Sequence, residues 1–164
     1  MPLILVRVDD RLVHGQVVVG WGLYLNPDRI ILCSDSIASS PWEKELYMSA
    51  EATAPYPLKI SVSTQEETLH MLKQTSDDKT ILLVESPQHI VELIEKGLDI
   101  DVVNIGGMHF KHGKTRLAAY IFVDNEDMAS LKKLLEMNIR LEGRDVPTAK
   151  SINLSDCLKK NPSA

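Results

Sequence analysis

Short apolar runs alternate with amphipathic segments along the chain. The run from Leu3 to Val8 is β-branched and stops at an acidic pair, which is typical of a fully buried strand in a parallel sheet. Apolar residues then recur at helical spacing over 11–25, where three glycines weaken the predicted helix. By the same criteria, further strands are predicted at 29–33, 58–62, 80–84, 102–105, 119–123 and 139–146.

Capping residues and prolines mark where the helices begin. Thr64 with Glu67 forms a capping-box pattern, and Ser86 followed by Pro87 is typical of an N-cap and a first helical position. The other helix boundaries predicted in this way are a start at Pro41, an end near Lys96 for the helix that follows Ser86, and a last helix from Asp124 or Asn125 to about Met137.

Strands that alternate with helices require right-handed crossovers and a sheet covered on both faces. We therefore predict an α/β fold, doubly wound, with a mostly parallel central sheet. We expect a single domain over 1–164, because the chain shows no internal repeat and no linker. A polar tail ending in Asn161, Pro162 and Ser163 is expected to lie outside the packed elements.

The composition excludes several functions. With 18 basic and 23 acidic side chains the formal net charge is -5, so there is no global positive field to bind nucleic acid or an anionic membrane. No apolar run approaches the roughly 20 residues that span a bilayer, and we expect a cytoplasmic protein. Cys33 and Cys157 form no CxxC pair, so neither a metal knuckle nor a disulfide framework is indicated.

The segment from Asp9 to Gln16 carries the densest set of reactive groups. It holds two carboxylates, a guanidinium and an imidazole directly after a buried strand. In parallel sheets such junctions are where loops meet and where helix N-termini offer unpaired N–H groups. We therefore expect the chemistry of the protein at this junction.

These side chains fit phosphorylation of a histidine. A neutral imidazole acts as nucleophile while its other nitrogen is held by a partner, which makes His14 the candidate nucleophile and Asp10 or Asp9 the candidate partner. Arg11 offers a planar fork to phosphate oxygens, and Gly15 lets the main chain approach them. The scheme needs no metal ion and no cofactor. The alternative from residue types alone is a surface salt bridge beside a histidine that only caps or packs.

The string VRVDDRLVHGQVVVGW strongly resembles the motif at the start of a known family. This is the IIB component of the mannose, fructose and sorbose class of the phosphoenolpyruvate-dependent sugar phosphotransferase system. The resemblance continues, in the expected order, through IILCSDSIASSPWEKELYMSA, DVVNIGGMHFKHGKTR and YIFVDNEDMASLKKLLEMNIRLEGRDVPT. The stretch 51–57 is richer in alanine and proline than the compact turn usual in the family.

The resemblance implies a mechanism and a set of partners. The histidine of the DRxxHGQ motif, which is His14 here, would carry the phosphoryl group on Nδ1, and Arg11 would support it. From the residue types themselves we add Asp10 to the candidate catalytic set, and we expect Gly15 and Gln16 to join Arg11 in binding phosphate. The group would arrive from a IIA component and leave for a sugar that enters through the IIC and IID membrane components. The chain would meet the membrane only through those partners.

The segment Gly107 to Thr115 partly matches a Walker A loop. Five residues rather than four separate its two glycines, and no hydrophobic helix follows, which disfavours a nucleotide site. The basic side chains of this region offer positive charge to phosphate or to an acidic partner, or are simply solvated: Lys111, Lys114 and Arg116.

The sequence offers two other candidate sites. His109 and His112 lack the companion ligands of a metal motif, so we predict no metal. Cys33 at a strand end is an alternative phosphoryl acceptor, although a small buried thiol is the commoner role. A regulatory module of the same fold and a nucleotide-binding enzyme remain competing functions.

Overall fold

The computed structural model describes residues 1–160, and within them the fold is α/β. Two compact units are present. The first comprises Met1–Val6 and Arg11–Val84, and the second comprises Arg7–Asp10 and the described residues from Glu85 onward. The first strand therefore contributes residues to both units. The polar tail predicted at 161–163 lies outside the described residues.

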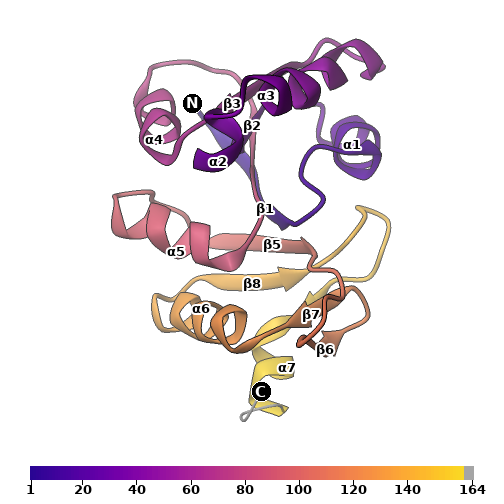
Figure 1. Cartoon of the computed structure of the whole chain (residues 1–164), viewed down its shortest axis with the longest axis vertical. Helices are drawn as coiled ribbons and strands as arrows, with labels where there is room; N and C mark the ends of the chain where they lie inside the picture. The colour runs from indigo at the N-terminus through magenta and orange to yellow at the C-terminus, as the bar shows by residue number, and fades with distance from the viewer. Residues whose placement is uncertain (161–164) are drawn as a thin grey trace. The chain divides into compact units, whose positions relative to one another are not determined.

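The main sheet has seven strands in the order β3-β2-β4-β1-β5-β8-β9 (Figure 1). The pairs β2–β3, β2–β4, β1–β5 and β5–β8 are parallel, whereas β8–β9 is antiparallel. This confirms the predicted mostly parallel α/β sheet. The strands are β1 (Leu3–Asp9), β2 (Arg29–Cys33), β3 (Lys59–Ser63), β4 (Thr80–Val84), β5 (Val102–Gly107), β8 (Arg140–Gly143) and β9 (Ile152–Asn153), with β6 (Thr115–Ala118) and β7 (Ile121–Val123) in a separate antiparallel pair.

The first unit packs its helices against β2, β3 and β4. Its helices are the π-helix η1 (Gln16–Trp21), α1 (Gly22–Leu25), α2 (Asp35–Ala38), α3 (Pro41–Met48), the 3₁₀-helix η2 (Ser49–Thr53) and α4 (Gln65–Lys73). Aliphatic side chains from the strands and from η1 form one core cluster, which includes Val17, Leu32 and Leu83. Burial of such side chains is the main force that holds η1 on the unit.

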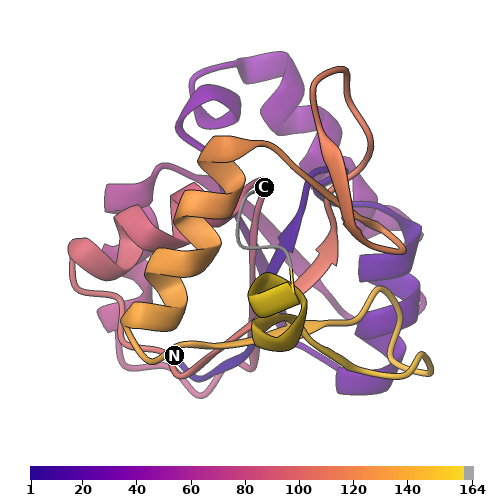
Figure 2. The same ribbon diagram turned by 90° about the horizontal axis from the view of Figure 1, so that it is seen from below.

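The second unit contains α5 (Pro87–Glu95), α6 (Asn125–Glu136) and α7 (Leu154–Lys160). Helices α5 and α6 lie side by side (Figures 1 and 2), and α7 packs against β8. Asp124 caps α6 in a capping box with Asp127, as its position before the helix predicts. Within 1–160, no helix is long and apolar enough to cross a membrane.

Most predicted strands and helix starts are confirmed, and the exceptions have physical causes. The helix predicted from Arg11 instead begins at Gln16, because Leu12 has a φ of 62° and cannot continue a right-handed helix. The strand predicted over 102–105 is two residues longer, since β5 continues to Gly107. The helix α2, the strands β6 and β9, and the helix α7 are short elements that the apolar pattern missed. The expectation of one domain over 1–164 stays a prediction.

Candidate functional site

The segment that follows β1 is held by its main chain and by a buried side chain. At the end of β1 the pairing with β5 shifts register between Val8 and Asp9, and Asp10 N–H bonds to Gly107 O at 3.0 Å. Two residues later Leu12 adopts its left-handed conformation while its side chain is buried in the core of the first unit. A bulky residue at positive φ is costly, so the buried contacts of Leu12 must stabilise this turn.

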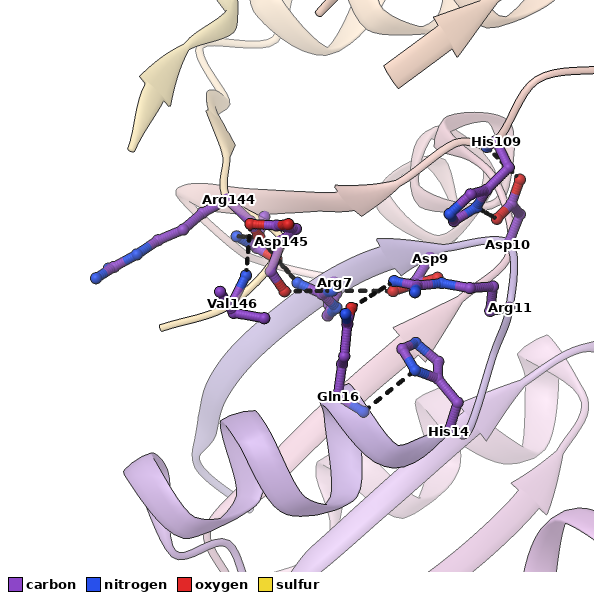
Figure 3. A network of polar contacts seen from close by, with 11 residues as sticks. Arg7, Asp9, Asp10, Arg11, His14, Gln16, His109, Arg144, Asp145 and Val146 are labelled. Atoms are coloured by element: carbon purple, nitrogen blue, oxygen red, sulfur yellow. Dashed lines mark hydrogen bonds and ion pairs between the residues drawn. The ribbon is translucent and has the colours of Figure 1, made fainter. Parts of the chain in front are cut away.

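Gln16 connects His14 and Arg11 within the first unit (Figure 3). Its main-chain N–H lies 3.3 Å from Nδ1 of His14, and its side-chain oxygen accepts a hydrogen bond of 2.9 Å from the Arg11 guanidinium. His14 itself is partly exposed. Three residues of the motif predicted from sequence are therefore brought together by their own local contacts.

The contact with Gln16 selects the tautomer of a neutral His14 ring. Because a main-chain N–H is only a donor, Nδ1 must act as the acceptor and carry a lone pair, which leaves the proton of a neutral ring on Nε2. A neutral imidazole with a lone pair on Nδ1 is a nucleophile at that atom. The arrangement can therefore support attack from Nδ1.

Gly15 offers open space rather than unusual backbone geometry. Its φ is -55°, which any residue adopts, and a Cβ built on it would meet no heavy atom within 4 Å. The glycine at this position is exposed and lies beside His14 in the chain. An incoming phosphoryl group or partner can approach the main chain here without a side chain in its path.

In the second unit, a buried arginine organises the end of β1. Arg7 and Asp9 are both 0% exposed and form an ion pair of 2.9 Å. The same guanidinium donates to Asn104 Oδ1 at 2.6 Å and to the main-chain oxygens of Arg144 and Asp145 at 3.0 and 2.9 Å. Sequence reasoning missed this network, although a charged residue in the middle of an apolar strand is itself a signal, since arginine is rarely buried unless it is paired.

The carboxylate of Asp10 is bound by His109 (Figure 3). Oδ2 accepts the main-chain N–H of His109 at 2.7 Å, and Oδ1 lies 2.5 Å from Nδ1 of the same residue. Both oxygens of Asp10 therefore help to fix the chain that follows β5. Its predicted role in orienting His14 stays a prediction.

Comparison with known protein families identifies the chain. The family model described as "PTS system sorbose subfamily IIB component" matches residues 3–164. The chain belongs to this family. Membership makes this IIB chain a phosphocarrier subunit of a sugar phosphotransferase system, as the resemblance from sequence implied.

Individual relatives agree with this assignment. The IIB chain is 33% identical over 162 residues to the "PTS system sorbose-specific EIIB component" of Lacticaseibacillus casei, covering 98% of this chain and 95% of that protein. It is also 33% identical to the "PTS system mannose-specific EIIAB component" of Escherichia coli K12, of whose length it covers 49%. The crystal structure of the IIBSor domain of the sorbose permease from Klebsiella pneumoniae superposes with a TM-score of 0.90 at 28% identity, covering 100% of both chains.

The basic residues after β5 differ in their surroundings. Lys114 of the IIB chain lies 2.7 Å from Asp127 at the start of α6, so its charge is largely compensated. The Arg116 side chain donates to Ala118 O at 3.4 Å on the exposed strand β6. Lys111 lines a cavity of about 210 Å³ in the second unit, together with Asp10, Glu85, Ser86, His89, Met108, Lys114 and Asp127.

One cluster in the second unit resembles a set of metal ligands. Asp9, Asp10 and His109 each offer an atom, and these atoms lie within 4.8 Å of one another. Asp9 is already paired with Arg7, and the Asp10 and His109 atoms are at hydrogen-bond distance from each other. A cation would have to displace both contacts, so the cluster is better described as two hydrogen-bonded pairs.

The two alternative sites from sequence gain no support from the geometry. Cys33 is 0% exposed at the end of β2, where no phosphoryl donor can reach its sulfur. The Walker-like segment leads from β5 into the short strand β6 rather than into a helix. It therefore lacks the helix N-terminus on which nucleotide phosphates rest in P-loop proteins.

Proposed function

We propose that His14 is the phosphoryl acceptor of this IIB chain and that Nδ1 is the nucleophile. The observation that carries the proposal is the contact of 3.3 Å between the Gln16 N–H and Nδ1, which directs the lone pair of the ring. The partly exposed position of His14 allows a donor protein to reach it.

In the first step the Nδ1 lone pair forms a bond to the phosphorus of a phosphohistidine on the IIA component, and the N–P bond of the donor breaks. His14 gives up its Nε2 proton and the donor imidazole regains one, so no proton is consumed. The Gln16 N–H then lies within reach of a phosphoryl oxygen. Such transfer depends mainly on alignment and on charge stabilisation by nearby donors.

Arg11 supplies the positive charge in this scheme. Its guanidinium is held by the Gln16 side chain at 2.9 Å, and an arginine fork can bind two phosphoryl oxygens at once. The open space at Gly15 leaves room for those oxygens beside the main chain. Arg11, Gly15 and Gln16 thus form the proposed phosphate-binding set, with Asp10 as the carboxylate that follows β1.

In the second step the phosphoryl group passes to a sugar hydroxyl. The new O–P bond forms as the N–P bond breaks, and the hydroxyl proton passes to the imidazole, which returns to its neutral form. Relatives of similar identity carry the names of different sugars, sorbose and mannose among them. We propose that sugar choice belongs to the IIC and IID membrane components and that this chain is a cytoplasmic carrier which docks on them.

The test is incubation with phosphoenolpyruvate, the general phosphocarrier proteins and a matched IIA component, followed by measurement of acid-labile label. Wild type should be labelled, His14→Ala should not, and His70→Ala should behave as wild type because His70 is exposed on α4. Addition of membranes that contain IIC and IID with a sugar should then remove the label and yield sugar phosphate.

Two results would contradict the proposal. Equal labelling of wild type and His14→Ala would place the acceptor on another residue. Stable label that never passes to any sugar in the presence of matched membranes would favour the regulatory alternative. Two-dimensional NMR of the labelled ring would distinguish Nδ1 from Nε2 directly.

A further inference from the structure

Tyr56 lies in the loop between η2 and β3 and contacts the end of the π-helix η1. Its hydroxyl donates a hydrogen bond of 2.7 Å to the main-chain oxygen of Val18. The same hydroxyl lies against Gly22, where a Cβ would come within 1.8 Å of Oη. Burial raises the pKa of the Tyr56 hydroxyl, so it stays protonated and donates at neutral pH.

Gly22 is the residue at which η1 passes into α1. Its N–H bonds to the main-chain oxygens of Val17 and Val19, which closes the wide turn. A π-helix is rare and occurs mostly as a single turn at functional sites, because its geometry is less favourable than that of an α-helix. Such a turn persists where contacts from outside the helix support it, and the Tyr56 hydroxyl is such a contact.

The N-terminal end of η1 adjoins His14. The main-chain N–H groups of Val17 and Val18 both bond to His14 O, at 3.0 and 2.9 Å. Val18 therefore bonds through its N–H to His14 and through its oxygen to Tyr56. A short series of hydrogen bonds therefore connects Tyr56 to His14, whose ring accepts the Gln16 N–H.

The loop that carries Tyr56 is itself fixed at its base. Glu51 Oε1 accepts the main-chain N–H of Ile60 at 2.5 Å, which joins η2, the element before the loop, to β3. The stretch 51–57, whose composition departs from the usual turn of the family, covers the end of η2 and most of this loop. The departure falls on the segment that supports η1.

We propose that Tyr56 is a positioning residue for phosphoryl transfer, because its bond to Val18 keeps η1 in the register in which the Gln16 N–H meets His14 Nδ1. This inference rests on the proposed role of His14. Without the hydroxyl, Val18 O can accept the Gly22 N–H instead, and the wide turn between Val17 and Gly22 relaxes to α-helical spacing. A change of one residue in a turn alters the facing direction by about 100°, so the Gln16 N–H leaves Nδ1.

The test compares Tyr56→Phe with Tyr24→Phe. Both changes remove one hydroxyl and keep the ring, but Tyr24 is 64% exposed on α1 and its ring packs edge-on against Trp21. Two quantities are measured: the transfer rate constant from phosphorylated IIA at saturating donor, by rapid quench, and the NMR signals of His14 Nδ1 and of the Gln16 amide in the unphosphorylated protein. Gly22→Ala is a second variant, because its Cβ displaces the Tyr56 hydroxyl.

Tyr56→Phe should lower the rate constant about five- to tenfold, the range expected for loss of one net hydrogen bond of roughly 1 kcal/mol, and should shift both NMR signals. The donor concentration at half-maximal rate should not change, and Tyr24→Phe should match wild type. A folded Tyr56→Phe with the wild-type rate constant and unshifted signals would overturn the inference, even if its melting temperature fell. Absence of label on wild type would refute the role of His14, whereas the NMR comparison would still test the contact.

Discussion

The substitution Gly106→Ala should destabilise the second unit through Arg7. A Cβ at position 106 would lie 1.8 Å from Cζ and about as close to both terminal nitrogens of the Arg7 guanidinium. An exposed arginine would simply move away. Arg7 is 0% exposed and its guanidinium makes four hydrogen bonds, so any displacement breaks several of them at once.

The expected loss in the free energy of unfolding comes from Asp9, which remains buried when the Arg7 guanidinium is displaced. Asp9 is also 0% exposed and would lose its partner at 2.9 Å. Removal of one member of a buried ion pair costs about 3–5 kcal/mol, because the remaining charge is desolvated without compensation. For a chain of this length that corresponds to a fall in melting temperature of about 6–20 °C.

Urea unfolding monitored by circular dichroism measures the effect, and a double-mutant cycle shows whether it acts through Arg7. In an Arg7→Met background the guanidinium is absent, so Gly106→Ala should cost less than about 1 kcal/mol there, which makes the coupling energy at least about 2 kcal/mol. Gly15→Ala is the control, because its φ is negative and no heavy atom lies within 4 Å of the new Cβ. It should change stability by less than about 1 kcal/mol.

Two outcomes would refute this reasoning. Gly106→Ala with a free energy of unfolding within about 1 kcal/mol of wild type would mean that the guanidinium relocates without loss. A large cost that is equal in both backgrounds would mean that the methyl group acts on something other than Arg7.

Two further predictions concern the role of Arg11 in phosphorylation and the dependence of protein stability on the Asp124 carboxylate at low pH. Arg11→Lys keeps the charge but loses the planar fork, so the rate constant of phosphorylation should fall about tenfold in rapid-quench assays; an unchanged rate would remove Arg11 from the mechanism. The hydrogen bond from the Asp127 main-chain N–H lowers the pKa of Asp124 below its ordinary value. Burial opposes this lowering of the pKa, and the charge of Lys114 adds to it. The ionised Asp124 carboxylate therefore stabilises the fold above about pH 4. This stabilisation is lost as the pH falls through the lowered pKa of Asp124 in the folded protein. Asp124→Asn keeps a capping oxygen, so its unfolding free energy should depend less on pH between about 5 and 2 than that of wild type.

The long elements and the acceptor motif follow from sequence because they depend on local patterns. The runs 29–33 and 80–84 are strands with the predicted bounds, the predicted capping box at Thr64 begins α4, and Asp124, one of the two predicted caps, begins α6. Gln16 lies close to both His14 and Arg11 through contacts that span at most five residues. Residues so close in the chain are expected to lie near one another, and for that reason the motif could be predicted as a group.

The features that sequence reasoning missed depend on residues far apart in the chain. Arg7 bonds to the main chain of Arg144 and Asp145, 137 and 138 residues away, and Tyr56 bonds to Val18 over 38 residues. The spacing of apolar residues does not predict the π-helix either, because helices are predicted from a period of 3.6 residues per turn. In the sequence these contacts are marked only by glycines at positions 22 and 106, where a Cβ would overlap the side chains of Tyr56 and Arg7.

The strand β1 has a consequence for how the protein is made. It leaves the ribosome well before its neighbours in the sheet, β4 and β5, which end at Val84 and Gly107, and Arg7 also needs the main chain at Asp145. At synthesis rates of about 5–20 residues per second, the strand waits several seconds for its partners. The buried ion pair of Arg7 and Asp9 is therefore completed only when the end of the second unit has been made, and early release of a shortened chain would leave Arg7 without the main-chain oxygens of Arg144 and Asp145.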